Sequence, residues 1–284
     1  MGNARPQAVG WETAYAKINL ALHVRRRLPN GYHEIETIFA FLDRGDRLRV
    51  QPSDCLQLTI DGPFGAGLDQ EDNLVTDAAK LLATHANIPA AAHIILEKNL
   101  PVSSGIGGGS ADAAATLRLL NKFWDINLPL RELASLSDSL GADVPACVII
   151  QTCLGTGIGQ DLVPVDDLAL RGMRVLLVNP RVAISTAQIF RDWDGVDGGS
   201  LGDGDILSMS SKGRNDLERP AIAQLPLIKD ILDKLSQTDP VLHRMSGSGA
   251  TCFALFDDTE AADIAQFKLL QAMPEAWALT GEIR

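Results

Sequence analysis

The chain has 284 residues, 46% of them hydrophobic and 21% charged, which provides enough apolar material for one large globular domain or two modest ones. Its formal net charge of −11 disfavours a nucleic-acid partner, because such proteins neutralise phosphates with clustered Lys and Arg. No basic start leads into an apolar run, and nowhere do roughly 18 apolar residues follow one another. We therefore expect a cytoplasmic protein with no membrane partner.

The first half of the chain predicts strands interspersed with helices. Residues 14–24 alternate apolar and mostly polar positions, which indicates a strand with one buried side. Further strands are expected at 47–51, 56–60 and 93–97, and helices at 73–85, 110–124 and 130–140. The helix at 130–140 ends at Gly141, a candidate left-handed cap.

A second unit is expected from about residue 166. It begins with a strand at 173–178 and a helix opened by Ser185, with Gln188 placed for a capping box. Residues 195–213, rich in Gly, Asp and Ser, predict a mobile loop. The remainder predicts helices at 221–235 and 259–272 and strands at 241–245, 251–256 and 277–282. The pattern indicates an α+β protein with domains at 1–165 and 166–284.

The four cysteines lie in apolar stretches without a Cys-x-x-Cys pair, which predicts buried free thiols rather than disulfides or a zinc site. They are Cys55, Cys147, Cys153 and Cys252.

A glycine cluster between a predicted strand and a predicted helix is the strongest local motif. Gly105 and the run Gly107–Gly109 leave room for a ligand, and the first turn of the helix offers free N–H groups and the positive end of its dipole to an anion. The alternative is a tight turn that only packs the helix on a sheet. A Walker A loop is excluded because no Gly-Lys dipeptide occurs, and the Rossmann fingerprint fits poorly because Ser110 stands where its third small residue belongs.

Three other positions have both a functional and a structural interpretation. Asp143, in Gly-Ala-Asp-Val-Pro, is either catalytic or a turn or cap aspartate satisfied by backbone N–H groups. Lys17 either lines a polar pocket with Asn19 or is an exposed lysine on a strand. The segment Ser246-Gly-Ser-Gly-Ala-Thr251 alone predicts a β-hairpin with a glycine turn.

Together these segments resemble the GHMP kinases, the family of galactokinase, homoserine, mevalonate and phosphomevalonate kinases. The resemblance is carried, in order, by segments spread over nearly the whole chain. They are Ala16–Leu22, Asn30–His33, Pro101–Ala114, Gly141–Pro145, Asn215–Glu218 and Ser246–Thr251. Within the family they are similar to members that act on a diphosphocytidyl sugar alcohol in the non-mevalonate pathway of isoprenoid biosynthesis.

The resemblance implies an N-terminal domain with the ribosomal-protein-S5 domain-2-like fold and a ferredoxin-like C-terminal domain. It also implies ATP and Mg²⁺ as cofactors. Lys17 and Asp143 would be catalytic. Residues implied to bind ATP are Lys98, Pro101, Val102, Ser103, Ser104, Gly105, Ile106, Gly107, Gly108, Gly109, Ser110 and Ala111. Residues implied to bind the second substrate are Asn19, Tyr32, His33, Thr186, Phe190, Gly247, Ser248 and Gly249.

Specificity is expected from aromatic side chains, with Tyr32 and Phe190 on the two faces of a cytosine and His33 at its edge. Phe190 could equally be a core residue. The family commonly has two serines after the glycines, whereas Ala111 follows Ser110 here, so the sequence leaves the Mg²⁺ ligands open. Rival interpretations are a GHMP kinase for a plain alcohol and a nucleotide-binding regulator without turnover.

Overall fold

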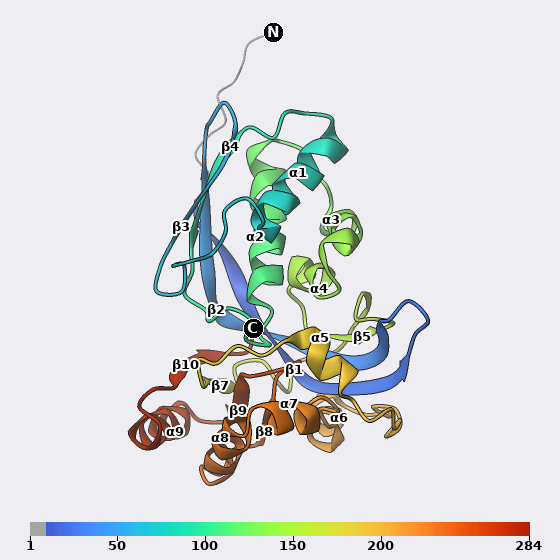
Figure 1. Ribbon diagram of the computed structural model, residues 1–284, viewed down its shortest axis with the longest axis vertical. Helices are drawn as coiled ribbons and strands as arrows, with labels where there is room; N and C mark the ends of the chain where they lie inside the picture. The colour runs from blue at the N-terminus through green and yellow to red at the C-terminus, as the bar shows by residue number, and fades with distance from the viewer. Residues whose placement is uncertain (1–9) are drawn as a thin grey trace. The chain divides into compact units, whose positions relative to one another are not determined.

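The computed structural model describes residues 10–284, which form two compact units. The units interleave along the chain, because each consists of several separate stretches of sequence (Figure 1). Unit 1 contains the described residues up to Ala16, Gly45–Val102 and Gly108–Ile150, and unit 2 contains Lys17–Arg44, Ser103–Gly107 and Gln151–Arg284. The long strands β1 (Glu12–Arg27) and β2 (His33–Gln51) contribute to both. The sequence predicts two consecutive domains that meet at residues 165 and 166. This expectation concerns a single cut in the chain and stays a prediction.

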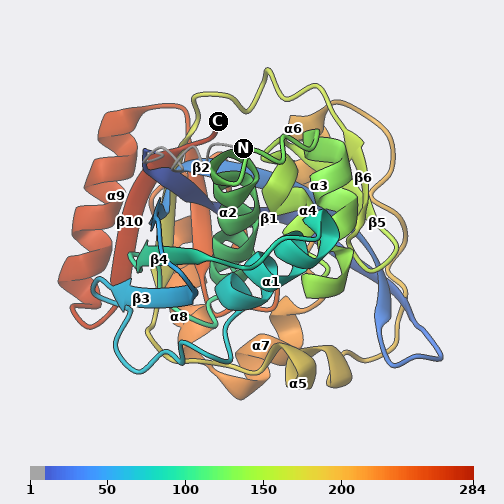
Figure 2. The same ribbon diagram turned by 90° about the horizontal axis from the view of Figure 1, so that it is seen from above.

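Unit 1 packs helices beside a small sheet. Strand β4 (Ala92–Glu97) pairs in parallel with β3 (Leu56–Asp61) and antiparallel with Arg47–Gln51 of β2. Helix α2 (Gly108–Phe123) is buried over most of its surface, because α1 (Leu74–Ala86) and α4 (Val144–Ile149) pack against it (Figure 2). The remaining helical elements are α3 (Leu130–Leu136) and a 3₁₀ turn at Ser137–Leu140.

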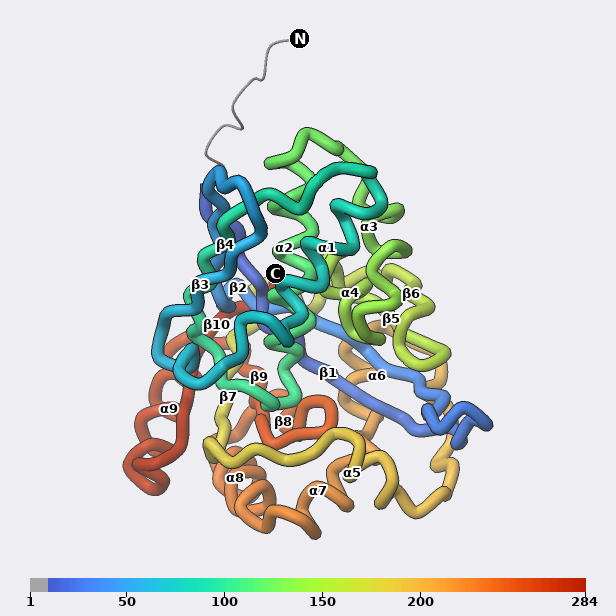
Figure 3. Tube along the Cα trace, turned by 45° about the horizontal axis from the view of Figure 1, so that its top comes forward, coloured from blue at the N-terminus to red at the C-terminus, as the bar shows by residue number. Residues whose placement is uncertain are grey.

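Unit 2 contains a four-stranded antiparallel sheet in the order β10-β7-β9-β8. Helices α8 (Leu227–Ser236) and α9 (Thr259–Ala272) pack on it, as the red and orange segments of Figure 3 show. This strand order is typical of ferredoxin-like domains and confirms the expected α+β class. The strands are β7 (Arg174–Asn179), β8 (Leu242–Met245), β9 (Cys252–Phe256) and β10 (Trp277–Glu282).

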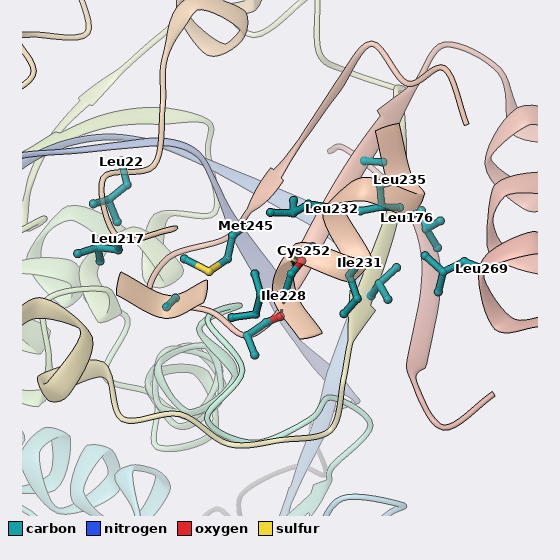
Figure 4. Close-up of a cluster of buried hydrophobic side chains, with 14 of the residues drawn as sticks. Leu22, Leu176, Leu217, Ile228, Ile231, Leu232, Leu235, Met245, Cys252 and Leu269 are labelled. Atoms are coloured by element: carbon teal, nitrogen blue, oxygen red, sulfur yellow. Dashed lines mark hydrogen bonds between the residues drawn. The ribbon is translucent and has the colours of Figure 1, made fainter. Parts of the chain in front are cut away.

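The core of unit 2 joins this sheet to residues from the start of the chain. Leu22, Val24 and Ile35 belong to the same buried cluster as Leu176 and Leu235 (Figure 4). The other elements of the unit are β5 (Cys153–Thr156), β6 (Asp161–Pro164), α5 (Thr186–Arg191), α6 (Ile206–Lys212) and α7 (Glu218–Gln224). No helix in the described part of the chain is both long and apolar enough to cross a membrane.

Several sequence predictions are wrong in instructive ways. Strand β1 is buried on both sides, because Lys17, Asn19 and His23 on its polar side are each 2% exposed. Residues 206–212 form a helix instead of part of a loop, with Asp205 as its side-chain cap. The single helix expected at 221–235 is two helices, which meet at Pro226.

Smaller corrections concern Gly141, Gln188 and one cysteine. Gly141 has φ 147° and ψ 151°, which is glycine backbone but not a left-handed helical cap. Ser185 accepts from Gln188 N, but the Gln188 amide bonds Asp192 instead of completing a capping box. All four cysteines are free, and Cys55 is exposed, whereas the other three are buried as predicted.

Candidate active site

Lys17 and Asn19 form a buried polar pair on β1. The Lys17 ammonium donates to Asn19 Oδ1 at 2.9 Å and lies 5.3 Å from the centroid of the Phe39 ring. Asn19 Nδ2 donates to Thr37 Oγ1 at 2.7 Å, and that hydroxyl donates to Ala21 O. A buried amide and ammonium with such partners are held in one orientation. Lys17 is 2% exposed, so the alternative of an exposed lysine on the strand is wrong.

In unit 2, the loop Ser103–Gly107 lies against the turn between β8 and β9. Ser246 Oγ accepts from Asn19 N at 3.1 Å and donates to Gly105 O at 2.9 Å. Thr251 N donates to Ser104 O, and Lys17 N donates to Ile106 O. Segments far apart in the sequence therefore meet around one serine hydroxyl.

Gly105 is required by this close approach. Its φ is +76°, and a Cβ there would lie 2.4 Å from Ser246 O and 2.7 Å from Gly249 O. Any side chain at this position would have to displace both backbone carbonyl groups. Part of the glycine cluster thus serves packing, which was the structural alternative for this motif.

The turn itself is the hairpin that the sequence predicts, and side chains fix it from outside. Asn215 Nδ2 donates to Met245 O and Gly247 O, each at 2.8 Å. Thr186 Oγ1 and Ser248 Oγ lie 2.8 Å apart. The hydroxyl pair places Thr186, at the start of α5, next to the glycine turn, while a role of these residues in substrate binding stays a prediction.

In unit 1, the first residue of α2 lies against a buried charge cluster. Lys98 is 2% exposed and forms ion pairs with Asp46 and, at 2.6 Å, with Asp112. Asp46 Oδ1 also accepts from the backbone of Asn99 and, at 2.8 Å, of Leu100. The cluster ties the segment after β4 to α2. The Lys98 ammonium is therefore fully engaged by the two carboxyl groups.

The cluster carries two carboxyl groups for one ammonium. Burial raises the pKa of Asp112 to about 8, opposed by Lys98 and reinforced by Asp46. Burial alone would lower the pKa of Lys98, but the two carboxylates raise it above its ordinary value. Asp112 therefore takes up a proton more readily than an ordinary carboxyl group, because burial and the second carboxylate both oppose its negative charge.

Asp143 directly precedes α4 but does not cap it. Its backbone carbonyl accepts from Cys147 N, while its side chain makes no hydrogen bond to the N-terminus of the helix. Asp143 is therefore not a side-chain cap of α4, whereas a turn aspartate remains the structural alternative to catalysis.

Three of the expected base-binding residues lie in unit 2, and the rings of two of them, His33 and Phe190, are neighbours. His33 is 8% exposed, and its ring centroid lies 5.1 Å from that of Phe190. Tyr32, the preceding residue, is 58% exposed and so free of the core. The sequence did not single out Trp193. Its ring meets that of His33 edge-on, with 5.8 Å between the two ring centroids.

The sequence analysis also missed Asp46, Asp112, Thr37, Ser246 and Asn215 as parts of these arrangements. Asp112, Ser246 and Asn215 lie in segments that carried the resemblance, so they could have been found. Asp46 and Thr37 lie in a stretch that gave no motif. Residues 10–284 contain no group of three His, Cys, Asp or Glu placed to hold a metal ion.

We expect Gly108→Val to weaken ATP binding about tenfold or more, because a Cβ there would lie 3.2 Å from the Lys98 ammonium and crowd the helix start. Gly108→Ala, with a smaller group at the same place, should lose less. Calorimetric titration with an ATP analogue measures both. Unchanged affinity in folded Gly108→Val would mean that the loop is only a packing turn.

Comparison with known proteins points to one family. Residues 73–150 match the family model described as GHMP kinases N terminal domain, and residues 204–275 match GHMP kinases C terminal. A 4-diphosphocytidyl-2-C-methyl-D-erythritol kinase of Rhizorhabdus wittichii is 49% identical over 96% of this chain and 94% of its own length. The protein of that name from Novosphingobium aromaticivorans is 48% identical over 96% of this chain and 92% of its own.

Solved structures agree with these sequence matches. A crystal structure of 4-(cytidine 5'-diphospho)-2C-methyl-D-erythritol kinase is 30% identical with a TM-score of 0.77, covering 96% of this chain and 99% of that one. Homoserine kinase from Cytophaga hutchinsonii has a TM-score of 0.71 over 94% of this chain and 95% of its own, but is 17% identical and supports the fold alone.

Proposed function

Because the chain belongs to the GHMP kinase family, a family of ATP-dependent small-molecule kinases, we propose that it phosphorylates 4-diphosphocytidyl-2-C-methyl-D-erythritol. The γ-phosphoryl group of ATP is transferred to the 2-hydroxyl, which gives the 2-phosphate and ADP. The observation that carries this proposal is the pair of relatives of that name, 48% and 49% identical over 96% of the chain. The reaction places the protein in isoprenoid precursor synthesis, and we propose that it works in the cytoplasm.

Phosphoryl transfer depends chiefly on positioning and on stabilising charge. We assign the triphosphate to Pro101–Ala111, where backbone N–H groups of the glycine cluster and the first turn of α2 can donate to anionic oxygens. Mg²⁺ would neutralise phosphate charge; we propose that phosphate oxygens and water hold it, with Ser110 as a candidate hydroxyl ligand.

Lys17 and Asp143 are the groups we assign to the transfer itself. Lys17 is held by Asn19 in a fixed direction, which suits an ammonium that must stabilise developing charge without reorganising. We assign Asp143 to orient the substrate hydroxyl and accept its proton, because a carboxylate has the chemistry that a general base requires.

The rival with most support is a kinase for a plain alcohol such as mevalonate or homoserine, which shares the fold. The ring cluster of His33 and Phe190, with exposed Tyr32 beside it in sequence, argues against this rival, because a plain alcohol offers no base to stack. An ADP-release assay with the diphosphocytidyl compound, mevalonate and homoserine separates the two. Turnover of mevalonate or homoserine alone would overturn the proposal, and turnover of none would favour a regulator.

We expect Tyr32→Ala and Phe190→Ala each to raise KM for the diphosphocytidyl substrate by about 5-fold to 150-fold. Stacking of one base on an aromatic ring contributes roughly 1–3 kcal/mol, which corresponds to that range. Neither change should alter KM for ATP. Steady-state kinetics with each substrate varied in turn measures this difference.

The uridine analogue provides the matching test of edge recognition, since it stacks equally well but presents different hydrogen-bonding groups. It should be a poor substrate. Equal use of both nucleotides would contradict the cytosine assignment even if kinase activity is confirmed.

A further inference from the structure

His33 has a buried ring nitrogen that the described residues leave without a hydrogen-bond partner. The atom is Nε2, and the whole residue is 8% exposed. Leaving a buried polar group unpaired destabilises the folded state, so the fold bears this cost unless something else bonds the nitrogen. A base edge bound at this ring would supply the missing partner.

Two aromatic side chains from the α5 region hold the His33 ring. Phe190 lies at 5.1 Å with its plane tilted by 37°, and Trp193 lies at 5.8 Å with an interplanar angle of 83°. Trp193 is 4% exposed and belongs to the core cluster of unit 2. The direction of the unpaired nitrogen therefore depends on where the end of α5 lies relative to the β1–β2 hairpin.

Arg27, at the end of β1, joins these two parts. Its Nη2 donates to Arg191 O at 2.8 Å and to Trp193 O at 2.7 Å. The last carbonyl groups of a helix lack partners within the helix, and a cation there is also favoured by the helix dipole. Arg27 thus binds the end of α5 from a strand whose hairpin carries Tyr32 and His33.

Arg27 also acts on the charge state of His33. Burial lowers the pKa of the imidazole below its ordinary 6.5, and the Arg27 guanidinium lowers it further. The other charged groups near these elements have partners of their own: Arg26 pairs with Glu34, Arg191 bonds Gln188, and Asp192 bonds Gln188 and Gln224. A neutral ring at pH 7 keeps one donor and one acceptor nitrogen, which a base edge with both kinds of group requires.

We propose that Arg27 is a positioning residue for base recognition, which fixes the end of α5 to the β1–β2 hairpin and so orients the His33 ring for the base. This rests on the proposed function, because it names how the same site selects its substrate. Arg27 touches no reacting atom in this scheme. Its effect passes through His33, Phe190 and Trp193.

Kinetics of Arg27→Ala tests the proposal. We expect KM for the diphosphocytidyl substrate to rise about tenfold or more. Without Arg27, the end of α5 and the hairpin would become ordered only when the substrate binds, and this ordering weakens binding. KM for ATP should not change, and kcat should change less than about threefold. Arg26→Ala is the matched control, since Arg26 is the neighbouring exposed arginine and pairs with Glu34 instead of α5. An unchanged substrate KM in folded Arg27→Ala would overturn the proposal.

A second measurement needs no substrate. Arg27→Gln keeps an amide donor but removes the charge, so the pKa of His33 should rise towards its ordinary value in histidine-ring NMR of the ligand-free protein. The acid limb of kcat/KM should shift upwards with it. Unaltered His33 titration would overturn the electrostatic part even if KM changes. Wild-type protein that fails to phosphorylate the diphosphocytidyl compound would instead reject the proposed function, and the titration would still report on the Arg27 contact.

Discussion

Asp143→Asn is expected to lower turnover by about 10²–10⁴-fold, the range for loss of a general base, while ATP binding and the melting temperature stay close to wild type. The amide keeps the shape of the carboxylate but cannot accept the proton of the substrate hydroxyl. Stability should change little because asparagine has nearly the same volume as aspartate. Single-turnover kinetics with saturating ATP measures the effect.

Asp138→Asn is the matched control for this variant. Asp138 lies on the 3₁₀ turn five residues earlier, is exposed, and carries the same chemical change outside the motif. It should retain wild-type turnover. Near-normal turnover in folded Asp143→Asn would remove Asp143 from the mechanism and favour substrate-assisted proton transfer.

Lys17→Met is expected to lower kcat by about 10²–10³-fold, as for loss of one preorganised group that stabilises transition-state charge. Methionine matches the length of the lysine stem, and the apolar side of β1 is untouched. The loss in stability should be smaller, about 1–3 kcal/mol, because Asn19 Oδ1 would lose its buried donor.

Measurement of kcat and of the melting temperature on the same preparation separates catalysis from folding. Lys80→Met, on the exposed side of α1, controls for the loss of a lysine charge and should leave both unchanged. A collapsed melting temperature with unaltered activity per folded molecule would make Lys17 a structural residue.

Periodicity and glycine placement made most of unit 2 predictable. Helix α9 and strand β10 begin and end where the sequence places them, and the Asp258 side chain caps the first turn of α9. The break at Pro226 was also visible in the sequence and was overlooked, although proline often starts a new helix.

The polar side of β1 could not be predicted. Alternation in the sequence separates apolar from polar positions, but it cannot show that Thr37 and Ser246 bond Asn19 from 18 and 227 residues away. The Lys98 cluster is similar: Asp46 lies 52 residues from its lysine in a stretch without a motif. Each motif was visible in the sequence, whereas the neighbours that orient its side chains were not.

Unit 2 is formed by three separate stretches of the chain, which limits the fragments that can be expressed on their own. A piece that starts at Gln151 would contain all of β7–β10 and α5–α9 but would lack Lys17–Arg44 and Ser103–Gly107, which belong to the same unit. Its core would lose Leu22, Val24 and Ile35 and expose the apolar surface that they cover. Such a piece would tend to aggregate. Ribosomal synthesis has the same constraint, since the N-terminal strands of this unit must wait for residues made more than a hundred positions later before their core can close.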